Sequence, residues 1–63
     1  MEVNVILADN NDLMRAGLRS ILSTEENIHI VSEAKSSQEL TAQVKSFMPD
    51  IVLIDYTSNE FEI

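Results

Sequence analysis

Two aspartates, Asp9 and Asp55, each follow a short apolar run and are the residues in this 63-residue sequence best suited to chemistry. The runs before them, 3–8 and 51–54, are rich in Val, Ile and Leu, which is typical of buried strands. In an open parallel sheet, ligands bind beyond the carboxyl ends of the strands. If the two strands are neighbours, their backbones lie about 4.8 Å apart. The two carboxylates would then meet at one end of the sheet.

Two carboxylates held this close disfavour each other unless a cation lies between them, and oxygen ligands on a polar loop suit Mg²⁺. An aspartate beside such a cation can also act as a nucleophile toward a phosphoryl group, because the metal neutralises the phosphoryl oxygens. The pattern therefore predicts a small acidic metal site that includes Asp9 and Asp55. The alternative is that both residues only end strands and cap turns, as isolated aspartates often do.

Five segments are expected to position these side chains. Apolar runs predict strands at 3–8, 28–34 and 51–55, and apolar spacings of three and four predict helices at 12–23 and 37–48. The connections are long enough for right-handed crossovers between parallel strands. The sequence thus predicts an α/β fold, a βαβαβ unit with a parallel sheet.

The helix at 12–23 has an apolar stripe and two candidate N-caps, Asn11 and Asp12. Arg15 and Arg19, four residues apart, are expected on its solvated face. Gly17 lowers helix propensity, which a close approach of the helix to the sheet would explain. The expected core-facing residues are Met14, Leu18, Ile21 and Leu22.

The other elements also have local signals. The segment 36–39, Ser-Ser-Gln-Glu, is typical of a capping box, and Pro49 is expected to end the second helix near Met48. The strand at 28–34 is expected at a sheet edge, with Ile28 and Ile30 on one side and His29, Val31 and Glu33 on the other. The strand ending at Asp55 is expected to be buried on both faces.

Composition limits the function classes. Eleven acidic residues against four basic ones give a net charge of −7, so direct nucleic-acid binding by this segment is not expected. Cysteine is absent, which excludes a thiolate metal site, and the single His29 is expected on the surface instead of serving as a ligand. The N-terminus lacks a basic signal-peptide region, and no apolar run approaches the ~20 residues of a membrane span. We expect a cytoplasmic protein without membrane contact.

Two segments resemble a known family. Val5–Leu22, Val-Ile-Leu-Ala-Asp-Asn-Asn-Asp-Leu-Met-Arg-Ala-Gly-Leu-Arg-Ser-Ile-Leu, is similar to the opening of receiver domains in LuxR-type response regulators. The segment 48–55, Met-Pro-Asp-Ile-Val-Leu-Ile-Asp, is similar to the family's third strand and its phospho-accepting aspartate. The resemblance covers nearly the whole chain. It implies that 1–63 is the N-terminal half of a receiver domain with a truncated flavodoxin-like fold and strand order 2-1-3.

The same resemblance implies a role for each site residue. Asp55 would accept a phosphoryl group from a histidine kinase and bind Mg²⁺, Asp9 would be the first of the family's acidic pair, and Thr57 would offer its backbone carbonyl to the metal. Asn10 stands where the family usually has a second carboxylate, so its amide oxygen would be a weaker ligand. Asp12 could compensate, although an N-cap role is favoured. The chain would be a phospho-acceptor that controls transcription in a complete protein, and not an enzyme.

Other readings stay open. The chain could be a degenerate receiver that serves, without phosphorylation, as a protein–protein association module. We also expect a homo-oligomer, because the family's fourth strand is missing and the edge of the third strand at 51–54 would be free to pair. A dinucleotide site is disfavoured, since the loop after the first strand lacks glycine. Arg15 and Arg19 could instead contribute to kinase docking.

Overall fold

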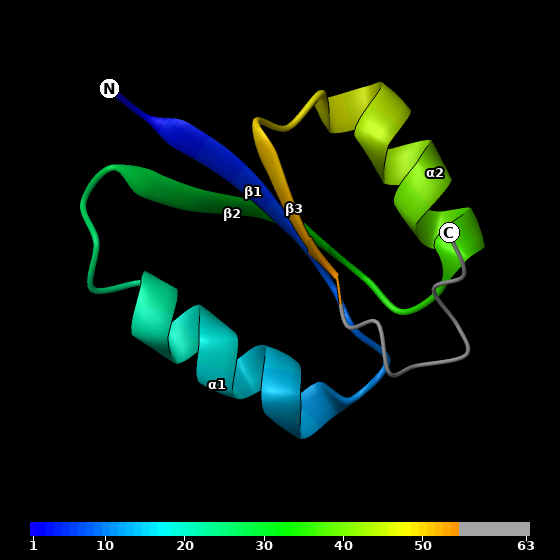
Figure 1. Cartoon of the computed structure of the whole chain (residues 1–63), viewed down its shortest axis with the longest axis horizontal. Coiled ribbons are helices and arrows are strands. Elements are labelled where there is room, and N and C mark those ends of the chain that lie inside the picture. Colours follow the sequence, from blue (N-terminus) through cyan, green and yellow to red (C-terminus); the bar gives the residue numbers. More distant parts are fainter. Residues whose placement is uncertain (55–63) are drawn as a thin grey trace.

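A computed structural model describes residues 1–54 of the chain. Three strands and two helices alternate along it: β1 (Val3–Ala8), α1 (Asp12–Leu22), β2 (Ile28–Ala34), α2 (Ser37–Phe47) and β3 (Ile51–Ile54). The strands form one sheet in the order β2-β1-β3, and both strand pairs are parallel. The two helices lie on opposite faces of this sheet (Figure 1). The predicted βαβαβ unit with strand order 2-1-3 is therefore confirmed.

The core is centred on β1, the middle strand. Ile6, Leu7 and Ala8 are fully buried, because strands flank β1 on both edges. On the face covered by α2, Ala8 and Ala34 pack with Leu40 of α2 and with the two residues of β3 that point the same way, Val52 and Ile54. Leu7 is directed to the opposite face, the one covered by α1.

Local capping sets the ends of both helices. Asn11 is the N-cap of α1, and its side-chain oxygen accepts a hydrogen bond from the amide of Met14 at 3.0 Å. Asp12 lies inside the first turn, so the prediction that it serves as an N-cap is wrong. Ser36 caps α2 as expected, accepting from the amide of Glu39 at 3.2 Å. The carboxylate of Glu39 accepts in turn from the amide of Lys35 at 2.9 Å.

Each helix ends one residue before its expected last residue. Ser23 is the C-cap of α1, and its amide donates to the carbonyl of Arg19. Met48 is the C-cap of α2 and adopts the left-handed region at φ 47°. Because the residue before a proline is disfavoured in right-handed helical geometry, Pro49 explains why the helix stops here.

The pairing of β2 with β1 skips one residue. Val5 pairs with Ile30, whereas Ile6 pairs with Ser32, so Val31 is an extra residue in β2. This irregularity changes the alternation of faces. Glu33, opposite Leu7, therefore lies on the α1 face together with Ile28 and Ile30. The prediction that Glu33 and these isoleucines lie on opposite sides of β2 is wrong. Strict alternation of side chains between the two faces takes no account of a bulge. The prediction that β2 is an edge strand holds.

Three further expectations about packing are wrong. Ile51 and Leu53 of β3 are 47% and 39% exposed, so β3 is covered on its α2 face only. In α1, Met14 and Ile21 are exposed, because the helix packs against β2 and not across the sheet. A Cβ added to Gly17 would have no described atom within 4 Å, so a close approach of the helix to the sheet does not explain this glycine.

Candidate functional site

The register of β1 and β3 brings the two predicted site strands together. Ala8 pairs with Ile54, and these are the residues immediately before Asp9 and Asp55 in the sequence. Asp9 is 4% exposed and Asn10 is exposed. Asp55 and Thr57 lie outside the described residues. The structure thus places one half of the predicted site, at the carboxyl end of the central strand.

Hydrogen bonds fix Asp9 on several sides. Its amide donates to the carbonyl of Ala34 at 3.0 Å, which extends the ladder between β1 and β2 by one residue. Its side-chain Oδ1 accepts from the amide of Asn11 at 2.8 Å, so the carboxylate turns back along the loop into α1. Its carbonyl accepts from Nη1 of Arg15 at 2.7 Å.

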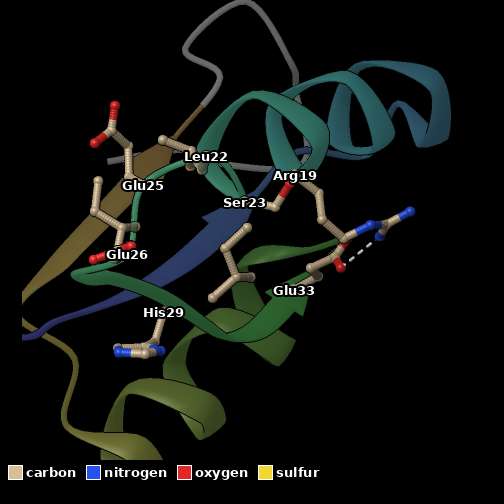
Figure 2. Close-up of a pocket in the computed structure, with 9 residues that line it drawn as sticks. Arg19, Leu22, Ser23, Glu25, Glu26, His29 and Glu33 are labelled. Atoms are coloured by element: carbon tan, nitrogen blue, oxygen red, sulfur yellow. Dashed lines mark hydrogen bonds and ion pairs between the residues drawn. The ribbon is translucent and has the colours of Figure 1, made fainter.

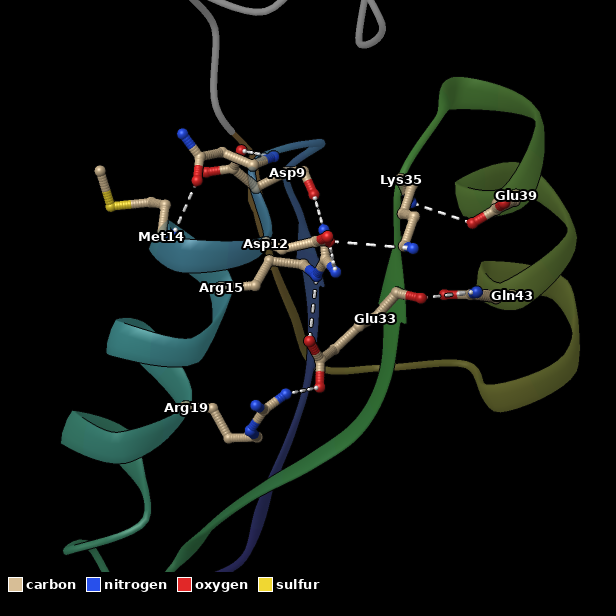
Figure 3. A network of polar contacts seen from close by, with 10 residues as sticks. Asp9, Asp12, Met14, Arg15, Arg19, Glu33, Lys35, Glu39 and Gln43 are labelled. Atoms are coloured by element: carbon tan, nitrogen blue, oxygen red, sulfur yellow. Dashed lines mark hydrogen bonds and ion pairs between the residues drawn. The ribbon is translucent and has the colours of Figure 1, made fainter.

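Arg15 is the centre of a polar network behind this loop (Figure 3). Its Nη2 pairs with Oδ1 of Asp12, and its Nε donates to Oε1 of Glu33 at 3.1 Å. Glu33 also accepts from Nη1 of Arg19 at 2.7 Å, and Nζ of Lys35 lies 3.8 Å from Asp12. The network ties the first turn of α1 to the end of β2.

The network shifts the pKa values of its members. Burial opposes ionisation of Glu33, but hydrogen bonds from Arg19 and Arg15 outweigh it and lower the pKa of this carboxyl. The hydrogen bond from Arg15 lowers the pKa of Asp12, and Lys35 adds to the effect. Burial alone would lower the pKa of Arg15, but its two acidic partners raise it instead. All three groups are therefore held in their charged forms.

The expectation that Arg15 and Arg19 share a solvated face is wrong for Arg15. Arg15 is 8% exposed, whereas the side chain of Arg19 is 53% exposed. Helical periodicity treats a charged residue as a surface residue, and it has no means of locating a buried partner such as Glu33. The bulge in β2 moves Glu33 onto the α1 face and makes this burial possible. No local pattern in the sequence indicates that Arg15 and Glu33 are partners.

The residues present at this end of the sheet suit an oxygen-liganded cation. Asp9 offers a carboxylate and Asn10 an amide oxygen, and a carboxylate that accepts one hydrogen bond keeps further lone pairs free. Among residues 1–54, no three His, Asp or Glu side chains converge as a ready metal cluster. Asp9 and Asn10 are therefore the described residues that could contribute oxygen ligands to such a cation.

A separate hollow of about 430 Å³ lies between the end of α1 and the first half of β2 (Figure 2). Its lining mixes apolar and charged side chains, among them Leu22, Ile28, Arg19, Glu26 and His29. Ile28 and His29 begin β2, whereas Asp9 follows the end of β1. In a parallel sheet the two regions lie toward opposite ends, so this hollow is not the predicted site.

The fold and site together describe an open α/β sheet with a buried carboxylate at the carboxyl end of its central strand. No family model matches the chain. Among known proteins, the chain is similar to response regulator protein VraR of Staphylococcus aureus, with 31% identity over 62 residues in strains COL and NCTC 8325 / PS 47. The match covers 98% of this chain, which spans about 30% of the length of these relatives.

This similarity confirms the resemblance seen in the sequence, and the strand order agrees with it. Over nearly its whole length the chain is thus similar to response regulators, and these homologues support a member of the two-component family. Neither α1 nor α2, the helices of the described part, has the length and apolar character needed to cross a bilayer.

Proposed function

We propose that this chain is the N-terminal part of a receiver domain and that Asp55 accepts a phosphoryl group from a histidine kinase. The observation that carries the proposal is the pairing of Ala8 with Ile54. Since this pair immediately precedes Asp9 and Asp55, the register supports two carboxylates at adjacent strand ends, where ligands of parallel sheets bind. Similarity to response regulators supports the kinase as partner.

In the proposed reaction, a carboxylate oxygen of Asp55 forms a bond to phosphorus while the bond from phosphorus to the kinase histidine breaks. The electron pair of that bond stays on the imidazole nitrogen, which takes up a proton. Bound Mg²⁺ would neutralise charge on the phosphoryl oxygens. Asp9, with Asn10 as a weaker neutral donor and the carbonyl of Thr57, would hold the cation beside Asp55.

The wider role is part of the same proposal. In a complete protein, phosphorylation would control transcription, and the chain itself would be an acceptor instead of an enzyme. The net charge of −7 supports the expectation that this segment does not contact nucleic acid directly. The absence of cysteine fits a reducing cytoplasm.

The proposal can be tested with a small donor that contains the phosphorus–nitrogen bond of phosphohistidine. The chain is incubated with phosphoramidate and Mg²⁺, and the phosphorylated product is detected by intact mass and by its release with hydroxylamine, which cleaves acyl phosphates. We expect the product in the wild type and in the exposed control Glu26→Ala. We expect none in Asp55→Ala. Labelling of Asp55→Ala at the wild-type level would rule out Asp55 as the acceptor.

A second candidate function is a phosphorylation-independent association module. Two observations favour it: Asn10 provides no second charge for the metal, and Ile51 and Leu53 are exposed on β3. Of the described strands, only β1 pairs with β3, so its other edge is open to a second copy of the chain. Titration with Mg²⁺, followed by NMR, discriminates the two functions. Binding at millimolar metal supports the receiver, and its absence supports the module.

A further inference from the structure

Arg15 combines deep burial with a position beside the proposed site. Within residues 1–54, Asp9 and Arg15 are the two charged residues that are buried. A buried guanidinium destabilises the fold unless its donors are bound. Arg15 has three acceptors on three elements of the chain: Asp12 in α1, Glu33 in β2, and the carbonyl of Asp9 after β1.

The bond to Asp9 is placed where the strand ladder ends. The amide of Asp9 still donates to β2, through the carbonyl of Ala34 at 3.0 Å. Its carbonyl accepts from Arg15 at 2.7 Å. Both backbone groups of Asp9 are therefore bound, which fixes the direction in which its carboxylate leaves the backbone.

Glu33 holds Arg15 in turn. Glu33 is opposite Leu7 in the sheet, and its Oε1 accepts from Nε of Arg15 at 3.1 Å while its other oxygen accepts from Arg19 (Figure 3). Arg19 thus shares the partner of Arg15, although no hydrogen bond joins it to Asp9. The planar guanidinium of Arg15 has five donors and reaches all three acceptors at once. The ammonium of a lysine, with three donors on one atom, cannot make the same set of bonds.

We propose that Arg15 is a positioning residue, which orients the Asp9 carboxylate for Mg²⁺ by holding the Asp9 backbone against β2. The inference rests on the proposed function, because it takes Asp9 as part of the cation site. The change in Mg²⁺ affinity that it predicts is opposite in sign to the change expected from simple electrostatics. Removal of a nearby positive charge should strengthen Mg²⁺ binding, whereas loss of a residue that orients a ligand should weaken it.

The test compares Mg²⁺ affinity in Arg15→Met, Arg15→Lys and the matched control Arg19→Met, measured by NMR titration of the 63-residue chain. Loss of a supporting contact typically weakens metal binding 10- to 100-fold. We expect an increase of about tenfold in the Kd of both Arg15 variants. We expect Arg19→Met to bind Mg²⁺ as tightly as the wild type or more tightly. Unchanged or tighter binding in the Arg15 variants would overturn the proposal, as would full recovery in Arg15→Lys.

A second measurement separates this proposal from the proposed function. The amide of Asn11 donates to the Asp9 carboxylate at 2.8 Å, so its hydrogen exchange reports the position of that carboxylate without any metal. We expect faster exchange at Asn11, relative to global unfolding, in the Arg15 variants but not in Arg19→Met. Should Arg15→Met fail to fold, Arg15→Lys provides the comparison. If the wild type binds no Mg²⁺, the metal site fails, and unchanged Asn11 exchange would then contradict the positioning role as well.

Discussion

At the scale of single residues, Glu33 links β2 to α1 by hydrogen bonds. It accepts hydrogen bonds from Arg15 at 3.1 Å and from Arg19 at 2.7 Å, and its side chain is 26% exposed. Burial would raise the pKa of Glu33, but the two arginines lower it overall. The ionised form is therefore more stable in the folded chain than in the unfolded one.

The lowered pKa of Glu33 predicts a pH dependence of stability. The stabilisation is complete above the ordinary carboxyl pKa of about 4.3 and is lost as the pH falls through the lower folded value. We expect Glu33→Gln to lower the free energy of unfolding at about pH 7 by about 1 to 2 kcal/mol. Below about pH 4 the variant should lose less additional stability than the wild type. Urea unfolding at both pH values provides the measurement.

The matched control for this prediction is Glu26→Gln, in the exposed connection after α1. Glu26 makes none of the contacts of the Arg15 network, so this variant should keep the pH dependence of the wild type. An equally steep loss of stability in acid for Glu33→Gln and the wild type would show that Glu33 does not contribute to it.

At the scale of elements, α1 contains a glycine that the structure of residues 1–54 does not require. Gly17 lies in the helix interior, is exposed, and meets no described atom within 4 Å of a built Cβ. Alanine in a helix is favoured over glycine by about 1 kcal/mol. We expect Gly17→Ala to raise the free energy of unfolding by about 0.5 to 1 kcal/mol in urea denaturation. A decrease would contradict this prediction.

The C-cap of α2 is a second position at which a substitution is expected to stabilise the chain. Met48 adopts φ 47° and is 80% exposed, so its side chain loses little packing when it is removed. A left-handed conformation costs a residue with a Cβ about 1 to 2 kcal/mol, while glycine adopts it freely. We expect Met48→Gly to stabilise the chain by about 0.5 to 1 kcal/mol, measured by thermal or urea unfolding. Met48→Ala, which keeps the Cβ, is the control and should not stabilise.

At the scale of the whole molecule, β3 is covered on one face of the sheet and exposed on the other. The α2 face buries Ala8 and Ala34 and partly buries Val52 and Ile54, whereas Ile51 and Leu53 are exposed on the α1 face of β3. A strand with an unpaired edge and exposed apolar side chains is prone to pair with another chain. The exposed side chains and unpaired edge of β3 in the described sheet thus favour association along this strand.

This arrangement predicts concentration-dependent oligomers, detected by light scattering. A charge on β3 opposes edge pairing, so Leu53→Lys should shift the chain toward monomer. The control Leu13→Lys changes an equally apolar, exposed residue on α1, which packs on β2, and should leave association unchanged. A monomeric wild type at high concentration, or equal association of all three proteins, would contradict association through β3.

Local patterns were enough for the order of elements and for the starts of both helices. Apolar runs and caps such as Ser36 act over a few residues, so β1, β2, β3 and both helices follow from the sequence, and parallel crossovers then restrict the sheet to few topologies. The position of Asp9 at a strand end follows in the same way. Asp55 is predicted by sequence alone, since it lies outside the described residues.

Tertiary structure decided which side chains of these elements are buried. The skipped residue Val31 moves Glu33 to the α1 face, and only then does Arg15 have a buried partner and a route to the carbonyl of Asp9. Burial of β3 likewise depends on what covers each face, not on its apolar run. Periodicity reports which residues could share a face. Which of them meet depends on register and packing between segments far apart in the chain, because these contacts form only when the sheet is assembled.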